Sequence, residues 1–464
     1  MATNAPRMRL RERYRSFLDV DMLHGPIFKS LVIFAIPVLL SGLFQNLYNS
    51  VDSLVVGRVL GEASLAAVGS GGTILELLIG FANGVGMGMS LVVAQKYGAG
   101  DTEGIKKTSA ACIVIGLTMT LLTSVLGLFF LKDLLLLLNT PAEILDEAYA
   151  YTRIIVANIY ATFLYNMFCG LLKALGNSFI PLLFLIFSSL LNIVLDLLFV
   201  VVLQRGVAGA AEATVIAQAV SALLCGIYIL KKTPILIPKK HHFRIDWKLY
   251  ADTAGSGVSM GLMSAIVMFG TLTLQYGINS LGTLTIAAHT AARKIYVFGT
   301  MPVNSLASSI SMFVSQNHGA KQYDRLRRAL RSCYLFNFIY AFFITALFWV
   351  LAPYAMKFIT GSENTEVLTN GIRYLRFVAP FYMILGMLTQ SRSALQGLGR
   401  KSLPIVSSVI ELVGKVIFTN MFVPKFGYSA VIVCEPIIWC LMAAQLIISL
   451  FLQPELKKKK PEVQ

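Results

Sequence analysis

Twelve long apolar runs, each about as long as a bilayer is thick, decide what this chain can fold into. A membrane-spanning helix needs about 20 mostly apolar residues. The runs lie at about residues 30–55, 64–94, 108–131, 148–172, 180–203, 208–230, 250–278, 285–314, 332–355, 373–396, 404–423 and 428–452. The longest connection, Lys231–Lys248, is too short to fold as a soluble domain. The sequence therefore predicts an all-α polytopic membrane protein with twelve transmembrane helices.

Composition excludes the soluble classes. Apolar residues make up 56% of the chain and charged residues 13%, against roughly 25% charged in an average globular protein. The mean hydropathy is +0.72. The six cysteines lie in apolar runs without metal-ligand spacing. Motifs for nucleotide binding, zinc proteolysis or serine hydrolysis are absent from the sequence. We expect neither an enzyme nor a cofactor.

The basic residues are distributed unevenly between the two sides of the membrane. Of 39 Lys and Arg residues, 27 fall on the side of the N-terminus and five on the opposite side. Cytoplasmic loops carry the excess of Lys and Arg, so both termini are predicted in the cytoplasm. This distribution explains the net charge of +16 without a nucleic-acid partner. We expect a multi-pass protein of the plasma (inner) membrane, in contact with the lipid bilayer and monomeric.

The two halves of the chain repeat each other. Leu60-Gly61 matches Leu281-Gly282 at an offset of 221, and Ala174-Leu175-Gly176 matches Gly397-Leu398-Gly399 at 223. Each repeat holds six spans, an even number, so both copies have the same orientation. Such copies are related by an axis along the membrane normal, an arrangement found in secondary transporters, and we expect a cavity between them.

This repeat sets the predicted domain organisation. The predicted parts are a cytoplasmic arm (1–24), an N-lobe (25–230), a cytoplasmic interlobe loop (231–249), a C-lobe (250–452) and a basic cytoplasmic tail (453–464).

Three polar stripes follow single helical faces in the N-lobe. At spacings of three and four residues, they are Gln45/Asn49/Asp52, Ser189/Asn192/Asp196 and Thr214/Gln218/Ser221. At 1.5 Å per residue, all three reach the outer half of the lobe. Carboxylates inside spans are costly and mark proton or ion sites, although a helix–helix hydrogen-bond seam is the alternative. We predict cation or proton coupling at Asp52, Asn192, Asp196 and Thr214, supported by Gln45, Asn49 and Gln218. The four coupling residues all offer oxygen ligands for Na⁺.

Other polar residues are candidates for a substrate cavity. Glu76 lies about 17 Å into its span and is either a contact for a substrate cation or a buried hydrogen-bonded acid. Gln275 either lines the cavity or bonds a neighbouring helix. Arg293 either faces the cavity, snorkels or pairs with an acid.

Three further acids are expected to be structural. Glu411 and Lys415, four residues apart, form a self-neutralising pair on one helical face. Glu212 and Glu435 lie near predicted outer helix ends, where we expect solvent around them.

Several segments together resemble the multidrug and toxic compound extrusion (MATE) transporters of prokaryotic type, over about residues 25–452. The matching segments are Pro37 with Gln45 to Asp52, Gln95 to Asp101, Gly176 to Ser178 with Pro181, Asn192 to Asp196, and Gly206 to Ala211 leading to Thr214. The resemblance implies two six-helix lobes forming a V, and drug or metabolite export by H⁺ or Na⁺ antiport. It also implies an N-lobe cation site at Asp52, Asn192, Asp196 and Thr214. Some members carry acids in spans 7 and 10, where this chain has none at mid-membrane, which favours coupling through the N-lobe.

The sequence thus predicts a secondary antiporter that exports small amphipathic, often cationic compounds. One alternative is a flippase for lipid-linked oligosaccharides, which a strongly cationic cavity would favour. The other is a non-transport membrane protein, which the repeat and the lack of catalytic clusters disfavour.

The predicted orientation can be tested by thiol labelling. In a cysteine-free background, we expect Lys357→Cys to react in intact cells with an impermeant maleimide, and Lys240→Cys to react only after lysis, because only the basic loop faces the cytoplasm. Labelling of the Lys240→Cys variant in intact cells would reverse the orientation.

Overall fold

The computed structural model of the chain describes residues 20–138, 140–361 and 363–457. The arginines from Arg7 to Arg15 and the lysines Lys458 to Lys460, which contribute to the predicted orientation, lie outside the described residues.

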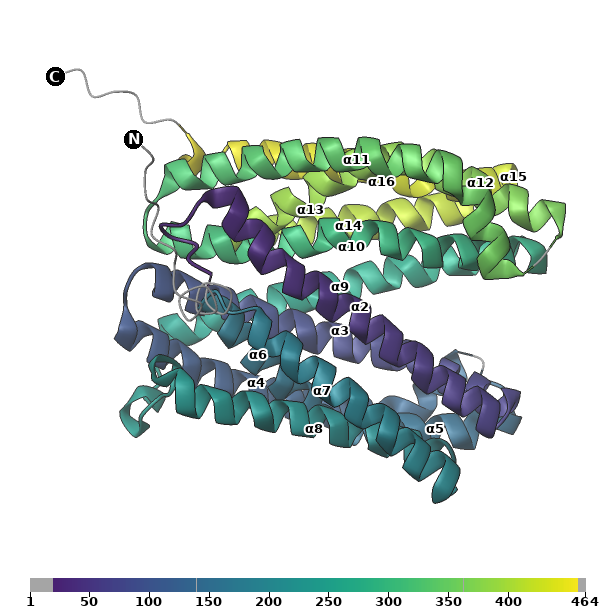
Figure 1. Cartoon of the computed structure of the whole chain (residues 1–464), viewed down its shortest axis with the longest axis horizontal. Coiled ribbons are helices and arrows are strands. Elements are labelled where there is room, and N and C mark those ends of the chain that lie inside the picture. Colours follow the sequence, from purple (N-terminus) through teal and green to yellow (C-terminus); the bar gives the residue numbers. More distant parts are fainter. Residues whose placement is uncertain (1–19, 139, 362, 458–464) are drawn as a thin grey trace, which may run out of the picture. The chain divides into compact units, whose positions relative to one another are not determined.

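The chain divides into two compact units, one ending at Gly261 and one beginning at Leu262. Helices of the first unit are α2 (Ile27–Val59), α3 (Glu62–Gly98), α4 (Thr102–Leu137), α5 (Ala142–Ala157), α6 (Ile159–Ala174), α7 (Phe179–Asp196), the π-helix η1 (Leu197–Val202) and α8 (Gly206–Lys232). After the short 3₁₀ segments η2 (Pro234–Leu236) and η3 (Lys240–Phe243), α9 (Trp247–Asn279) begins in the first unit and ends in the second (Figure 1). The lobe boundary expected at 231–249 stays a prediction.

The second unit repeats this order of helices. They are α10 (Thr283–Gly319), α11 (Tyr323–Thr360), α12 (Thr365–Val378), η4 (Ala379–Phe381), α13 (Tyr382–Gly397), α14 (Ser402–Ile417), the π-helix η5 (Phe418–Phe422), α15 (Val423–Phe426), α16 (Tyr428–Phe451) and η6 (Pro454–Leu456). Among the eleven candidate spans in the described residues, α3 is the most buried of the first unit and α10 the most buried of the second.

The predicted spans are confirmed. In the described residues, eleven helical segments are long and apolar enough to cross a membrane, and α5 with α6, bent by 46° around Asn158, makes up to twelve. Several helices are much longer than the predicted runs, as in α3 with 37 residues and α11 with 38. At 1.5 Å per residue these measure about 56 Å, well beyond the roughly 30 Å of hydrocarbon. Apolarity locates only the part in lipid, whereas α3 continues to Gly98, three residues before Asp101 caps the start of α4.

The backbone confirms the internal repeat. Residues with a positive φ angle, in the left-handed region, recur in pairs at the ends of corresponding helices: Gly61 with Gly282, Gly100 with Lys321, Gly176 with Gly399, and Gly206 with Gly427. These offsets are 221 or 223, the same as in the sequence. The two π-helices also correspond, because η1 begins at Leu197 and η5 at Phe418.

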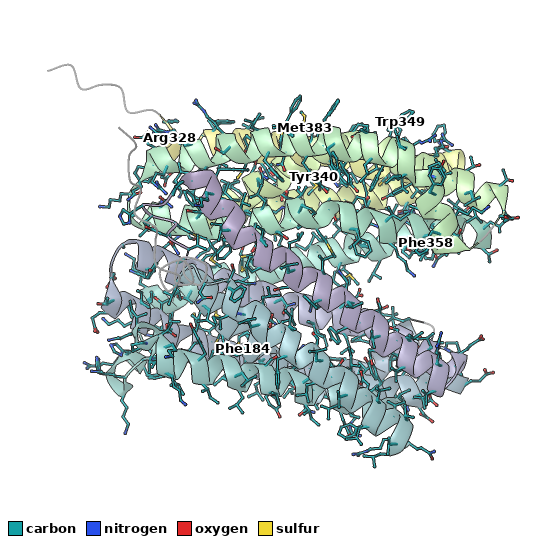
Figure 2. The ribbon with its side chains drawn as sticks, in the orientation of Figure 1. Phe184, Arg328, Tyr340, Trp349, Phe358 and Met383 are labelled. Atoms are coloured by element: carbon teal, nitrogen blue, oxygen red, sulfur yellow. The ribbon has the colours of Figure 1, made fainter. Side chains whose placement is uncertain are left out.

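Large apolar side chains project outward from the helices, as lipid contact requires. On α11, Phe342, Trp349 and Phe358 are 77%, 54% and 90% exposed; Figure 2 labels the last two. In water such exposure would form an extended apolar patch. In a membrane these side chains meet lipid.

Glycines on α3 let the beginning of α9 approach at backbone distance. A Cβ atom at Gly84 would lie 2.6 Å from the carbonyl oxygen of Met260 and 2.8 Å from the nitrogen of Gly261. One at Gly88 would overlap the carbonyl oxygen of Ser256. Both helices carry glycines four residues apart, Gly84 with Gly88 and Gly257 with Gly261, a spacing that favours close crossings in membranes. The crossing therefore leaves no room for larger residues.

Replacing Gly88 tests this crossing. Gly88→Ala should lower the thermal stability of the purified protein, because overpacking against backbone costs about 1–3 kcal/mol. The control is Gly80→Ala on the same helix, where a Cβ meets nothing within 4 Å and the higher helix propensity of Ala should leave stability unchanged or raised. Equal melting temperatures for the two variants would contradict a close α3–α9 crossing.

Candidate functional site

A polar cavity of about 270 Å³ lies inside the first unit. Helices α2, α3 and α5 to α8 all contribute to its wall. Six of the residues singled out in the sequence line it: Gln45, Asn49, Asp52, Glu76, Thr214 and Gln218. Two of the three predicted stripes, those on α2 and α8, thus meet around one space.

The other two predicted residues, Asn192 and Asp196, lie on α7 behind this wall. Both are buried, with 1% and 0% of their surfaces exposed. The Asn192 side chain connects to the cavity because its Nδ2 donates to Thr214 Oγ1 at 3.5 Å. Asp196 interacts electrostatically with the carboxylate of Asp52. It also precedes η1, whose wide turn is a common feature of functional sites.

The oxygen atoms around these residues lack donors. Within the described residues, no hydrogen-bond partner is found for Asp52 Oδ1, for Asn192 Oδ1 or for either carboxylate oxygen of Asp196. Gln218 Oε1 is also without one. Buried polar atoms are almost always hydrogen-bonded, so a cluster of unpaired oxygens is unusual. Such a set fits a proton or a hard cation such as Na⁺.

Negative charge dominates the cavity. Asp52, Glu76 and Asp196 form no ion pair within the described part of the chain. The basic side chain in the wall is Lys173, near the end of α6. A space with this excess of carboxylate attracts cations.

Sequence reasoning missed several residues of the wall. Tyr48 lies one turn before Asp52 on the same face of α2, and Asn83 lies two turns after Glu76 on α3. The same helical spacing that identified the acids could have found both. Asn166 on α6 was harder to identify from the sequence, because the bend at Asn158 separates its helix from the preceding one.

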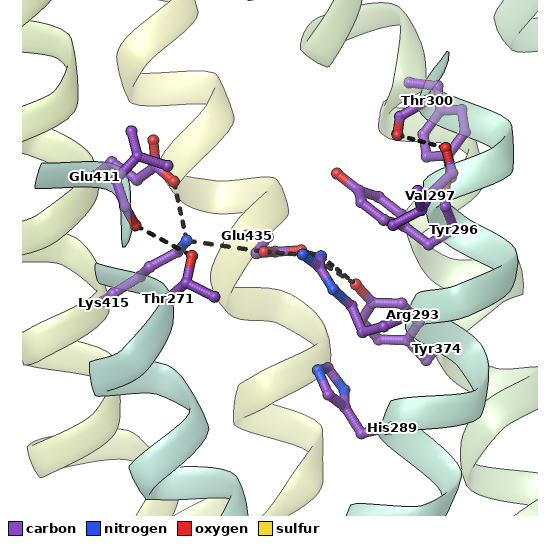
Figure 3. A network of polar contacts seen from close by, with 12 residues as sticks. Thr271, His289, Arg293, Tyr296, Val297, Thr300, Tyr374, Glu411, Lys415 and Glu435 are labelled. Atoms are coloured by element: carbon purple, nitrogen blue, oxygen red, sulfur yellow. Dashed lines mark hydrogen bonds and ion pairs between the residues drawn. The ribbon is translucent and has the colours of Figure 1, made fainter. Parts of the chain in front are cut away.

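The second unit holds a network of paired charges instead (Figure 3). Arg293 Nη1 on α10 donates to both carboxylate oxygens of Glu435 on α16, at 3.2 and 3.0 Å. Tyr374 on α12 donates to Glu435 Oε2 at 3.1 Å. Lys415 Nζ donates to Glu411 Oε1 at 2.9 Å and lies 3.9 Å from Glu435 Oε1. The predicted Glu411–Lys415 pair is confirmed.

The expectation for Glu435 is wrong. Its surface is only 7% exposed, where we expected solvent. The residue lies two turns inside α16, and its partner Arg293 comes from a helix 142 residues earlier, which no local pattern reveals. Glu212, by contrast, is at a partly exposed helix start and pairs with Arg205 at 2.9 Å.

A second cavity, of about 300 Å³, adjoins this network. Gln275 and Arg293 both line it, together with His289, Lys294, Lys415 and Glu435. Gln275 also donates to Asn279 Oδ1 at 2.8 Å. The three predicted cavity residues therefore lie in two different cavities, Glu76 in the first unit and Gln275 and Arg293 in the second.

One cluster has the composition of a metal site but the hydrogen bonding of a structural contact. Glu103, His241 and His242 bring their ligand atoms together in the first unit. Nδ1 of His242 accepts the Lys239 backbone N–H at 2.7 Å, so Nε2 of the neutral ring carries the proton. That nitrogen lies 2.9 Å from Glu103 Oε2 and donates to it. The arrangement fastens the loop before α9 to the start of α4.

Comparisons with known proteins agree with this architecture. The family model described as MatE matches residues 37–198 and 260–421, once in each half. The probable multidrug resistance protein YoeA of Bacillus subtilis is 26% identical over 395 residues, covering 84% of this chain and 85% of that protein. The multidrug export protein MepA of Staphylococcus aureus is 21% identical over 433 residues, covering 92% and 94%.

Solved structures show the same fold. An outward-facing multidrug resistance MATE family transporter of the MOP superfamily superposes with a TM-score of 0.87 at 24% identity, covering 95% of this chain and 99% of that one. A MATE protein in the bent conformation gives a TM-score of 0.85 at 24% identity, covering 93% and 96%. Since the family model matches most of the chain, this protein belongs to the MATE family of transporters.

Proposed function

We propose that this MATE transporter exports amphipathic, cationic compounds in exchange for H⁺ or Na⁺, and that the coupling ion binds at Asp52, Asn192, Asp196 and Thr214. We further propose that it acts as a monomer in the plasma membrane with both termini in the cytoplasm. The observation that carries the coupling proposal is the cluster of buried oxygens without donors in the first unit.

Burying carboxylate oxygens without hydrogen-bond donors costs free energy, and this cost favours the binding of a cation. Two carboxylates, Asp52 and Asp196, are buried within range of each other without a basic partner in the described residues. Their mutual repulsion and their desolvation both favour the uptake of one positive charge. A proton satisfies one carboxylate oxygen, whereas Na⁺ draws on several oxygens, including the amide of Asn192 and the hydroxyl of Thr214.

Competition for the same negative charge couples the ion to the substrate. An organic cation in the cavity beside Glu76 and Asp52 neutralises part of the charge that otherwise holds the ion. Binding of either cation therefore weakens binding of the other, and this reciprocity is what exchange requires. The names of the relatives, multidrug resistance and export proteins, support amphipathic drugs as substrates.

Neutralising Asp196 tests the coupling. In proteoliposomes, Asp196→Asn should reduce gradient-driven ethidium transport by at least about tenfold, because it removes the charge that the ion balances. Transport is measured separately under a proton gradient and a sodium gradient, and only one gradient should drive the wild type. The matched control is Thr419→Val in the second unit, at the position that the sequence offset of 223 pairs with Asp196, where the hydroxyl donates to Thr273 O at 3.3 Å. Loss of transport in the control but not in Asp196→Asn would refute the site.

Combining both acids tests whether they act as one site. If Asp52 and Asp196 share one ion, the double Asn variant should lose little more transport than either single variant, because each single change already destroys the exchange. Independent acids would instead give losses that multiply. Ethidium binding measured at equilibrium, without a gradient, separates lost coupling from lost substrate affinity.

A further inference from the structure

We infer that the cavity of the second unit is a binding site for organic anions, in particular for amphipathic compounds that carry a carboxylate. This site goes beyond the proposed export of cations and rests on residues that the proposed coupling does not use.

The two acids of the buried network, Glu411 and Glu435, are both paired with neighbouring bases. Glu435 receives two contacts from Arg293 and one from Tyr374. Glu411 is held by Lys415 at 2.9 Å and lies 3.9 Å from Arg392. Figure 3 shows Glu435 between Arg293 and Lys415. Neither carboxylate retains charge with which to bind an organic cation.

Positive charge is in excess around the same cavity. In the cavity wall three bases, Arg293, Lys294 and Lys415, stand against one acid, Glu435. Lys294 is exposed and lines the cavity, and no ion pair or hydrogen bond is found for its side chain within the described residues. It lies 11 residues into α10, within the span predicted at residues 285–314. An unpaired ammonium within a span is costly unless it faces water or an anion.

The cavity wall also supplies polar groups for a carboxylate and apolar surface for the rest of the ligand. Arg293 remains 31% exposed beside Lys294, and its contacts with Glu435 and Tyr374 all use Nη1. Gln275 and Thr290 add polar groups, while Leu274, Ile278 and Val297 add apolar surface. A volume of about 300 Å³ is at the lower end of small-molecule sites and suits a bicyclic aromatic acid.

Equilibrium binding of 2-naphthoate to the full chain in nanodiscs tests the site. The matched neutral ligand is 2-naphthamide, which has a similar shape and no charge. Wild type should bind the acid at least about tenfold more tightly than the amide, since a charge-assisted contact adds that much. Lys294→Gln should remove this preference, and Lys294→Arg should keep it. Lys357→Gln, which removes an exposed base paired with Glu363 outside the cavity, should bind like wild type.

Two outcomes would overturn the inference. One is equal affinity of wild type for acid and amide, and the other is an unchanged preference in Lys294→Gln. Asp196→Asn should bind naphthoate like wild type, because it lies in the other unit. A failure of cation coupling therefore leaves this result untouched, and a failure here leaves the proposed function untouched.

Discussion

A charged side chain inside a membrane span is stable only beside a counter-charge, in a wet cavity, or after it has taken up a proton or a cation. The two units meet this requirement in different ways. In the first, Asp52 and Glu76 line a cavity and Asp196 is buried behind its wall, and none of the three forms an ion pair in the described residues. In the second, Glu411 and Glu435 are neutralised by bases from three helices. Equivalent folds thus carry opposite excesses of charge.

Packing of the central helix connects this chemistry to the fold. Helix α3 presents Glu76 to the cavity and, two to three turns later, presents Gly84 and Gly88 to the beginning of α9. Since the glycines allow backbone contact, the position of α3 along its own axis is closely fixed. The depth of Glu76 within the unit is therefore set by residues that take no part in binding.

Much of this organisation could be predicted from the sequence, because its signals are periodic or repeated. Apolar runs gave the spans, and spacings of three and four residues placed Asp52, Thr214 and Gln218 around one space. Other features have no local signal. The contact between Arg293 and Glu435 joins residues 142 positions apart, and the π-helix after Asp196 is an uninterrupted apolar run with no residue that marks the wider turn. Hydropathy also cannot register a helix that continues past the lipid, as α11 does.

Matching irregularities in the two halves also separate what the six-helix repeat holds constant from what varies between its copies. The paired left-handed residues and the two π-helices occupy corresponding places, although the side chains around them differ. Features that both copies share belong to the six-helix repeat itself. Asp196 matches Thr419 at the offset of 223 and Ile417 at the offset of 221, so in either register this carboxylate distinguishes the copies rather than uniting them. The irregular backbone is thus common to both repeats, whereas the division of charge is set by the side chains that each repeat carries separately.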